Sequence, residues 1–178
     1  MSFFDKPLFL YRPPYGKHYH EDFETLRFMI DAGVRTVVLS PMNTLNSFGE
    51  PYSEHPPIWK WFQTCDFNIL ESLIQEVLKI SPEIRFILTI DLNSPQWLSR
   101  RLLLDSFYSL GEISLHSRWK EETSAYLRAF INYCETRHRE RVCGYILACG
   151  RTLEWIESRN DKPGPAKCAA YTQWCRER

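Results

Sequence analysis

The chain has 178 residues, of which 44% are hydrophobic and 25% charged, the composition of an ordinary globular domain. Lysine plus arginine equals aspartate plus glutamate at 22 each, so the charge balance indicates neither nucleic acid nor an anionic membrane as a partner. The amino-terminal segment has no apolar run of the length that a signal peptide or a spanning helix needs. We therefore expect a cytoplasmic protein that forms a single domain over residues 1–178.

Four short apolar segments are predicted to be strands. Each is rich in β-branched or aromatic residues and nearly continuous in hydrophobicity, as strands buried on both faces are. They cover residues 7–12, 34–40, 85–91 and 142–149.

Between these segments the apolar residues recur with a helical period. A first stripe from Phe23 to Ile30 ends at Gly33, a residue suited to a left-handed helix C-cap. Stripes at 70–78 and 119–134 follow two candidate N-caps, Asp66 and Ser117, and residues 165–178 form a last predicted helix.

The resulting order β-α-β-α-β-α-β-α predicts an α/β fold with a parallel sheet and right-handed crossovers. An open doubly wound sheet and the first half of a (β/α)8 TIM barrel both begin in this way. The segments 41–65 and 92–116 that follow two of the strands are long, and long loops at strand carboxyl ends build the active site of a TIM barrel. The first strand-to-helix turn also lacks G-x-G-x-x-G. We predict a partial TIM barrel of about four βα units.

Three segments together resemble a known family. NSFGEPYSEHPPIWKW (46–61), DLNSPQWL (91–98) and GYILACGRTLEW (144–155) are similar to the amino-terminal half of the retaining TIM-barrel glycoside hydrolases, in particular the β-galactosidase-like family 42. The resemblance runs through nearly the whole chain. It implies hydrolysis of O-glycosyl bonds by an acid/base residue and a nucleophile, without a cofactor.

The resemblance places the general acid/base just after the fourth strand, where Glu154 stands. Leu153 occupies the position before it, where the clan commonly has asparagine. The adjacent indole of Trp155 and partial burial at a barrel mouth would raise the pKa of this carboxyl and keep it protonated. The alternative is a surface glutamate that caps the following turn or pairs with Arg151.

Six further residues are candidates for substrate binding. They follow strand ends or carry exposed aromatic rings, and hydroxyl-rich sugars bind to such polar and aromatic side chains. These candidates are Arg12, Asn43, Asp91, Asn93, Trp97 and Trp155. Each could instead satisfy backbone groups or pack within its own loop.

Metal chemistry is not indicated. His18 and His20 form an HxH pattern, but they lie several residues past the first predicted strand, where further ligands are lacking. The six cysteines contain no CxxC pair, so we expect reduced thiols and no disulfide, metal or cofactor.

A retaining glycosidase needs a second carboxylate about 5 Å from the first, and the clan supplies it from a seventh strand. Because a whole barrel takes about 250 residues, we expect a truncated, amino-terminal half with an incomplete active site. Such a half would bind its carbohydrate with a complementary carboxyl-terminal half, or would self-associate through exposed strand edges. The alternative function is a non-catalytic carbohydrate-binding or assembly module derived from a glycosidase barrel.

Overall fold

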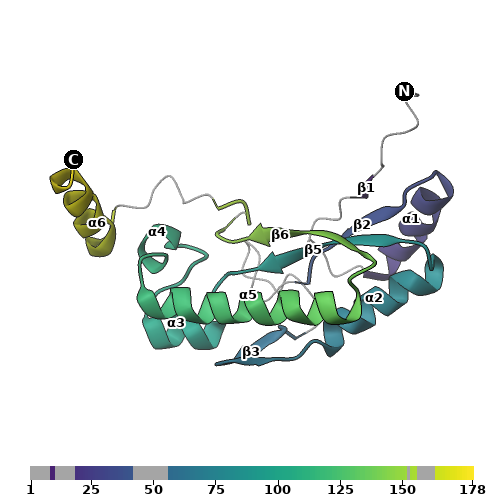
Figure 1. The fold of residues 1–178 in the computed structure, drawn as a ribbon, viewed down its shortest axis with the longest axis horizontal. Coiled ribbons are helices and arrows are strands. Elements are labelled where there is room, and N and C mark those ends of the chain that lie inside the picture. The colour runs from purple at the N-terminus through teal and green to yellow at the C-terminus, as the bar shows by residue number, and fades with distance from the viewer. Residues whose placement is uncertain (1–8, 11–18, 42–55, 152, 156–162) are drawn as a thin grey trace.

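The computed structural model describes residues 9–10, 19–41, 56–151, 153–155 and 163–178 (Figure 1). Their elements are, in chain order, β1 (Phe9–Leu10), α1 (Tyr19–Asp31), β2 (Thr36–Leu39), β3 (Trp59–Trp61), β4 (Thr64–Cys65), α2 (Asn68–Ile80), β5 (Arg85–Asp91), α3 (Gln96–Leu102), α4 (Leu110–Ile113), α5 (Ser117–Arg137), β6 (Val142–Ala148) and α6 (Pro165–Arg176). The α/β class predicted from the sequence is confirmed.

The main sheet has four parallel strands in the order β1-β2-β5-β6. Strands that follow one another along the chain, apart from the separate β3–β4 pair, are therefore neighbours in the sheet. A doubly wound sheet reverses its strand order at a switch point. The described strands contain no such reversal.

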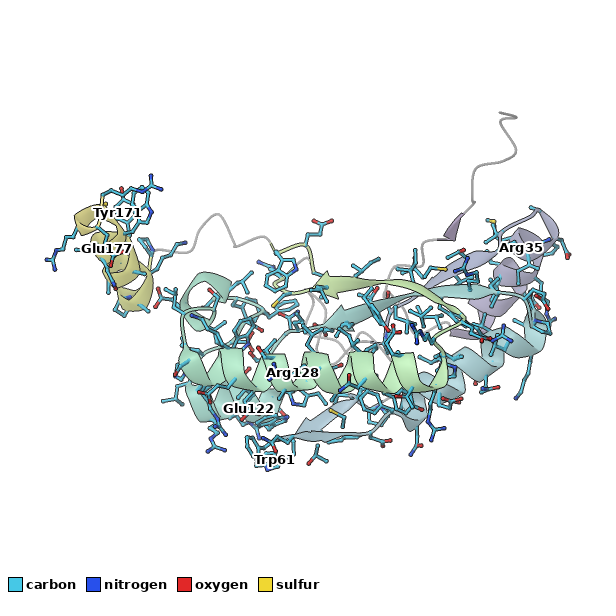
Figure 2. The ribbon with its side chains drawn as sticks, in the orientation of Figure 1. Arg35, Trp61, Glu122, Arg128, Tyr171 and Glu177 are labelled. Atoms are coloured by element: carbon cyan, nitrogen blue, oxygen red, sulfur yellow. The ribbon has the colours of Figure 1, made fainter. Side chains whose placement is uncertain are left out.

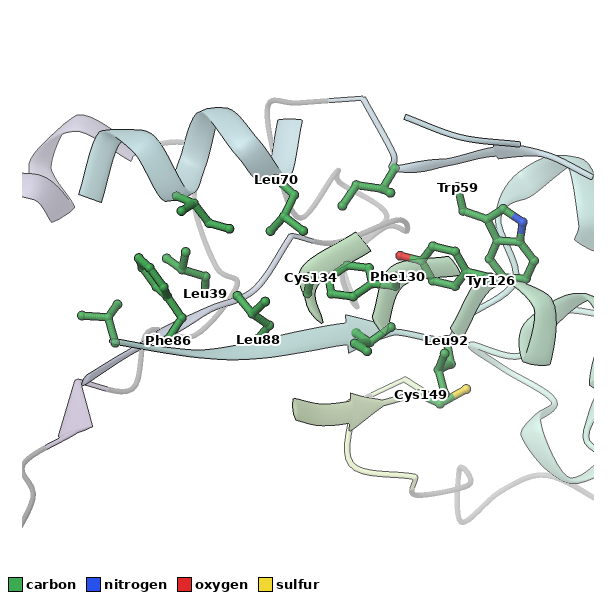
Figure 3. Packing of buried hydrophobic residues seen from close by; sticks show 14 of the residues in the cluster. Leu39, Trp59, Leu70, Phe86, Leu88, Leu92, Tyr126, Phe130, Cys134 and Cys149 are labelled. Atoms are coloured by element: carbon green, nitrogen blue, oxygen red, sulfur yellow. The ribbon is translucent and has the colours of Figure 1, made fainter. Parts of the chain in front are cut away.

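One face of the sheet packs against helices. In Figure 1, α2, α3 and α5 lie together below the strands. Alternate strand residues such as Leu39, Phe86 and Leu88 meet Leu70 of α2 and Phe130 of α5 in one buried cluster (Figure 3). Side chains alternate between faces along a strand, so this face takes every second residue.

The other face of the sheet carries smaller and more polar residues. Thr36, Thr89 and Asp91 are buried there, and the Ser40 hydroxyl donates to Thr89 Oγ1 at 2.9 Å. A parallel sheet buried on both faces normally has apolar residues on both. Polar groups on the second face indicate that it is more than a packing surface.

The ends of the helices agree in part with the caps predicted from sequence. Gly33 ends α1 at a φ of 102°, as predicted, because glycine reaches this region without steric cost. The prediction of Asp66 as the cap of α2 was wrong by one residue: Phe67 is the N-cap and makes no side-chain cap bond, although Asp66 Oδ1 accepts from the Asn68 amide. The prediction of Ser117 as a cap was wrong by one residue: His116 is the N-cap of α5, and its Nδ1 accepts from the Arg118 amide.

Both long segments predicted to be loops contain regular structure, the pair β3–β4 within 41–65 and the helices α3 and α4 within 92–116. The antiparallel pair β3–β4 lies on the side of α5 away from the main sheet (Figure 1). Trp59 of β3 is buried and stacks on Tyr126 of α5, with ring centroids 4.7 Å apart. The helix layer is therefore covered on both sides, and the connection before α2 contributes to the core.

Helix α6 is attached differently from the others. None of its residues is buried, and it lies apart from the sheet (Figure 1). The two carboxylate oxygens of Glu112 in α4 accept from the amides of Ala166 and Lys167 in its first turn. A Cβ on Gly164 would collide with the Glu112 carboxyl, so a larger residue at that position would have to displace this side chain.

None of the described helices combines the length and the apolar character that crossing a bilayer requires.

Candidate functional site

The candidate site lies at the carboxyl ends of β5 and β6, where a buried polar cluster joins the two strand ends. Asn93 is fully buried. Its Oδ1 accepts from the Gly150 amide at 2.9 Å and from the Ser106 hydroxyl at 3.0 Å, and its Nδ2 donates to the Gly150 carbonyl at 3.2 Å. One amide thus satisfies both backbone groups of the residue that begins the turn after β6.

Asp91 belongs to the same cluster. Its carboxylate is fully buried, and Oδ1 accepts from the Asn93 amide at 3.0 Å. Burial, followed by the nearby charge of Asp91, raises the pKa of the Cys149 thiol to about 12. Figure 3 shows Cys149 close to Leu92 at the strand ends. The thiol is therefore a buried, protonated group.

The turn that carries Glu154 has an unusual backbone. Gly150, Leu153 and Trp155 have φ values of 81°, 62° and 60°, all in the left-handed region. For a residue with a Cβ this conformation is rare and costs about 1–3 kcal/mol, and it persists only where surrounding contacts enforce it. Glu154 therefore lies between two strained residues.

Specific contacts hold this turn in place. The Trp155 indole Nε1 donates to the Leu147 carbonyl at 2.8 Å, and the Trp155 amide donates to the Cys149 carbonyl at 2.9 Å. The Leu153 side chain packs against Phe107. Both neighbours of Glu154 are consequently fixed to β6 and to the segment before α4.

Glu154 itself is exposed, so the expectation of partial burial was wrong. The reason is that the contacts of this turn are made by its neighbours, Leu153 on Phe107 and the Trp155 indole on the Leu147 carbonyl, and neither contact covers Glu154. The alternative in which Glu154 pairs with Arg151 is also not seen: the Arg151 guanidinium lies 5.9 Å from the centroid of the Tyr108 ring, and no ion pair joins these two described residues.

Of the other residues predicted to bind substrate, the structure brings Asp91, Asn93 and Trp155 to this turn. Trp97 lies elsewhere: in α3 its ring contacts Trp59 at 5.7 Å and Trp61 at 4.9 Å. Trp61 projects from the side of the helix layer away from the sheet (Figure 2). Arg12 and Asn43 lie outside the described residues, as does His18, and the side chain of His20 is not described.

Sequence reasoning missed several residues of the cluster. Ser106 receives hydrogen bonds from the Ser94 amide and hydroxyl at 2.6 and 3.1 Å and donates to Asn93. The DSF segment at 105–107 has an Asp-Ser pair typical of turns, which could have indicated this local role. Nothing in the sequence shows that Ser106 would lie beside Asn93.

In the described part of the chain, no three His, Cys, Asp or Glu side chains are grouped so that they could hold a metal ion. All six cysteines are free. Three of them, Cys143, Cys168 and Cys175, are exposed.

Comparison of the chain with protein-family models, with curated proteins and with solved structures gave no match.

Proposed function

We propose that this chain carries the acid/base glutamate of a retaining glycoside hydrolase, with Glu154 as the proton donor and a partial (β/α)8 barrel as its scaffold. The observation that carries the proposal is the turn itself. A solvent-facing carboxylate stands between two strained residues at the carboxyl end of the fourth parallel strand. Strain of this kind is concentrated at functional sites because selection for stability alone would remove it.

The strand order supports a barrel scaffold. In a TIM barrel each strand pairs with its successor, and catalytic residues lie at strand carboxyl ends. The order β1-β2-β5-β6 follows that rule. Barrel interiors also receive alternate strand residues, which fits the buried Thr89 and Asp91 on the face opposite the helices.

The resemblance in sequence assigns the nucleophile to a seventh strand, whereas β6 is the fourth parallel strand. The proposal therefore gives Glu154 the proton-transfer half of the mechanism. An exposed carboxyl would acquire the low-polarity surroundings of a general acid when a sugar ring covers it, since substrate displaces water from the site. The open face of Trp155, 46% exposed, is adjacent in the chain and offers a stacking surface.

A pair of matched variants tests the role of Glu154. Glu154→Gln keeps the shape of the side chain and removes its acidic proton. Glu140→Gln makes the same change at an exposed position near the other end of β6. Hydrolysis should be measured on aryl glycosides with graded leaving groups, with the chain alone and with a carboxyl-terminal half of a family-42 enzyme added. Glu154→Gln should abolish turnover of substrates with poor leaving groups and spare activated ones.

Equal loss on all leaving groups, or no loss, would exclude Glu154 as the acid. The alternative is a carbohydrate-binding module, which the exposure of both Glu154 and the Trp155 ring favours. Calorimetric titration with oligosaccharides distinguishes the two: a module binds without turnover, and Glu154→Gln leaves its affinity within about a factor of ten, a difference of about 1.4 kcal/mol.

A further inference from the structure

Strand β6 lies at the end of the described sheet and has an unusual composition for an edge. Residues 142–149 contain no charged residue and no proline. Ile146 is 38% exposed and Leu147 43% exposed. Natural edge strands are protected from pairing by charges, proline or bulges, because their free backbone groups would otherwise bind another strand. The carboxyl half of β6 has none of these devices.

The ladder with β5 determines which backbone groups face outward. The Leu92 amide donates to the Ala148 carbonyl, so Ala148 faces β5. The direction alternates along a strand, and the register from Gly144 to Ala148 is regular. The amide and carbonyl groups of Tyr145 and Leu147 therefore point away from the sheet.

Trp155 occupies part of this edge. Its indole donates to the Leu147 carbonyl at 2.8 Å and its amide donates to the Cys149 carbonyl at 2.9 Å. These are the outward acceptors that a neighbouring strand would use. No described residue bonds to the outward amide and carbonyl of Tyr145 or to the Leu147 amide, so the plug formed by Trp155 covers only the carboxyl half of the edge.

We propose that the outward edge of β6 pairs with the same edge of a second copy of this chain, and that Trp155 is the plug that restrains this pairing. An antiparallel pair of identical strands closes around a twofold axis, so the surface needs to be complementary only to itself. The absence of charge along β6 means that no register brings like charges together. The net charge of zero adds no long-range repulsion between two copies.

Pairing of two β6 edges would also affect the turn that carries Glu154. A strand that binds the Leu147 carbonyl must displace the Trp155 indole, which is one of the contacts that hold Leu153 and Trp155 in left-handed conformations. Association and the geometry of the turn are therefore linked, whatever chemistry Glu154 performs. The inference does not rest on the proposed glycosidase activity.

Trp155→Phe tests the plug because it keeps an aromatic ring and removes the N–H donor. One neutral hydrogen bond contributes about 1 kcal/mol net, and a twofold pair displaces two indoles, so the dimer dissociation constant should fall about thirtyfold. Trp174→Phe is the matched control, since Trp174 is exposed on α6 to a similar extent, 48% against 46%. Sedimentation velocity over a wide concentration range measures the association of each variant.

Leu147→Lys in the Trp155→Phe background locates the interface. Lysine at an exposed edge position opposes strand addition, so this double variant should remain monomeric, and circular dichroism should show an unchanged fold. A Trp155→Phe protein that associates no more strongly than the Trp174→Phe control would overturn the role of the plug. Dimers that persist with Leu147→Lys would overturn the location at β6.

Discussion

The first prediction concerns Asn93, which sequence analysis placed among sugar-binding residues and which the structure shows as a clamp between β5 and β6. Replacing it with alanine removes a weak hydrogen bond from the Cys149 thiol at 3.6 Å and three stronger ones, two to the Gly150 backbone and one to Ser106. At about 1 kcal/mol each, these contribute about 3 kcal/mol. The buried Gly150 amide is then left without a partner, which adds about 1–2 kcal/mol.

Asn93→Ala should therefore lower the free energy of unfolding by about 4 kcal/mol. For a chain of this length that corresponds to a fall of about 10 °C in Tm. Urea titration followed by circular dichroism measures the change. Asn132→Ala provides the control: Asn132 is exposed on α5, and alanine there should be neutral or stabilise by up to about 0.7 kcal/mol.

A loss below about 1 kcal/mol would refute the reasoning, because it would mean that the bonds to Gly150 are replaced by water at little cost. If Asn93→Ala instead weakened oligosaccharide binding while stability stayed unchanged, the side chain would be a ligand-binding group, as the sequence first indicated.

Three further predictions concern the helix layer and the thiols. Trp59→Ala should lower the free energy of unfolding by about 3–5 kcal/mol, whereas Trp61→Ala on the same hairpin should lower it by less than about 1 kcal/mol, because only Trp59 is buried. Matched urea titrations measure both changes, and similar losses for the two variants would contradict the packing. Burial opposes ionisation of Glu71, but hydrogen bonds from Gln75, His138 and Tyr133 outweigh it and lower its pKa below 4.5. The stability that the carboxylate adds is present above pH 4.5 and is lost as the pH falls through the lowered pKa. Glu71→Gln should therefore destabilise by about 1–2 kcal/mol at pH 7, and urea titrations should show this loss shrinking as the pH falls below 4.5. Burial raises the pKa values of Cys134 and Cys149 to about 12, so a thiol reagent at pH 8 should modify the three exposed cysteines quickly and these two only on unfolding; fast labelling of either would contradict the packing.

Much of the fold could be predicted from the sequence because its signals are local. The segment 85–91 coincides with β5, and Gly33 follows the end of α1 in the left-handed conformation. A continuous apolar run or a suitable cap residue carries its own structural preference, so no knowledge of distant contacts is needed.

The elements that were missed share a physical cause. Gln63 turns the β3–β4 hairpin and Leu103 ends α3, with φ values of 50° and 54°. Both adopt the left-handed conformation that glycine or asparagine usually marks in a sequence. Leu153 and Trp155 do the same around Glu154. Because none of these four residues is glycine or asparagine, single-sequence patterns do not reveal the turns.

The candidate site was predictable only in outline. Glu154 and the strand end that carries it follow from the order of the elements. The hydrogen bonds of the buried Asn93 side chain come from Gly150 and Ser106, which approach from separate segments. Side-chain partners of this kind are determined by the assembled fold.

The attachment of α6 has a mechanical consequence. The first turn of α6 is hydrogen-bonded to the Glu112 carboxylate, which lies 54 positions before Ala166 in the chain. No side chain of α6 is buried. The orientation of α6 is therefore determined by a side chain outside the helix, at one point of attachment. Shortening the Glu112 side chain, or placing a methyl group on Gly164, would change the orientation of the whole helix. The stacked pair Tyr171 and Trp174 would then move with α6, although no residue within the helix is changed.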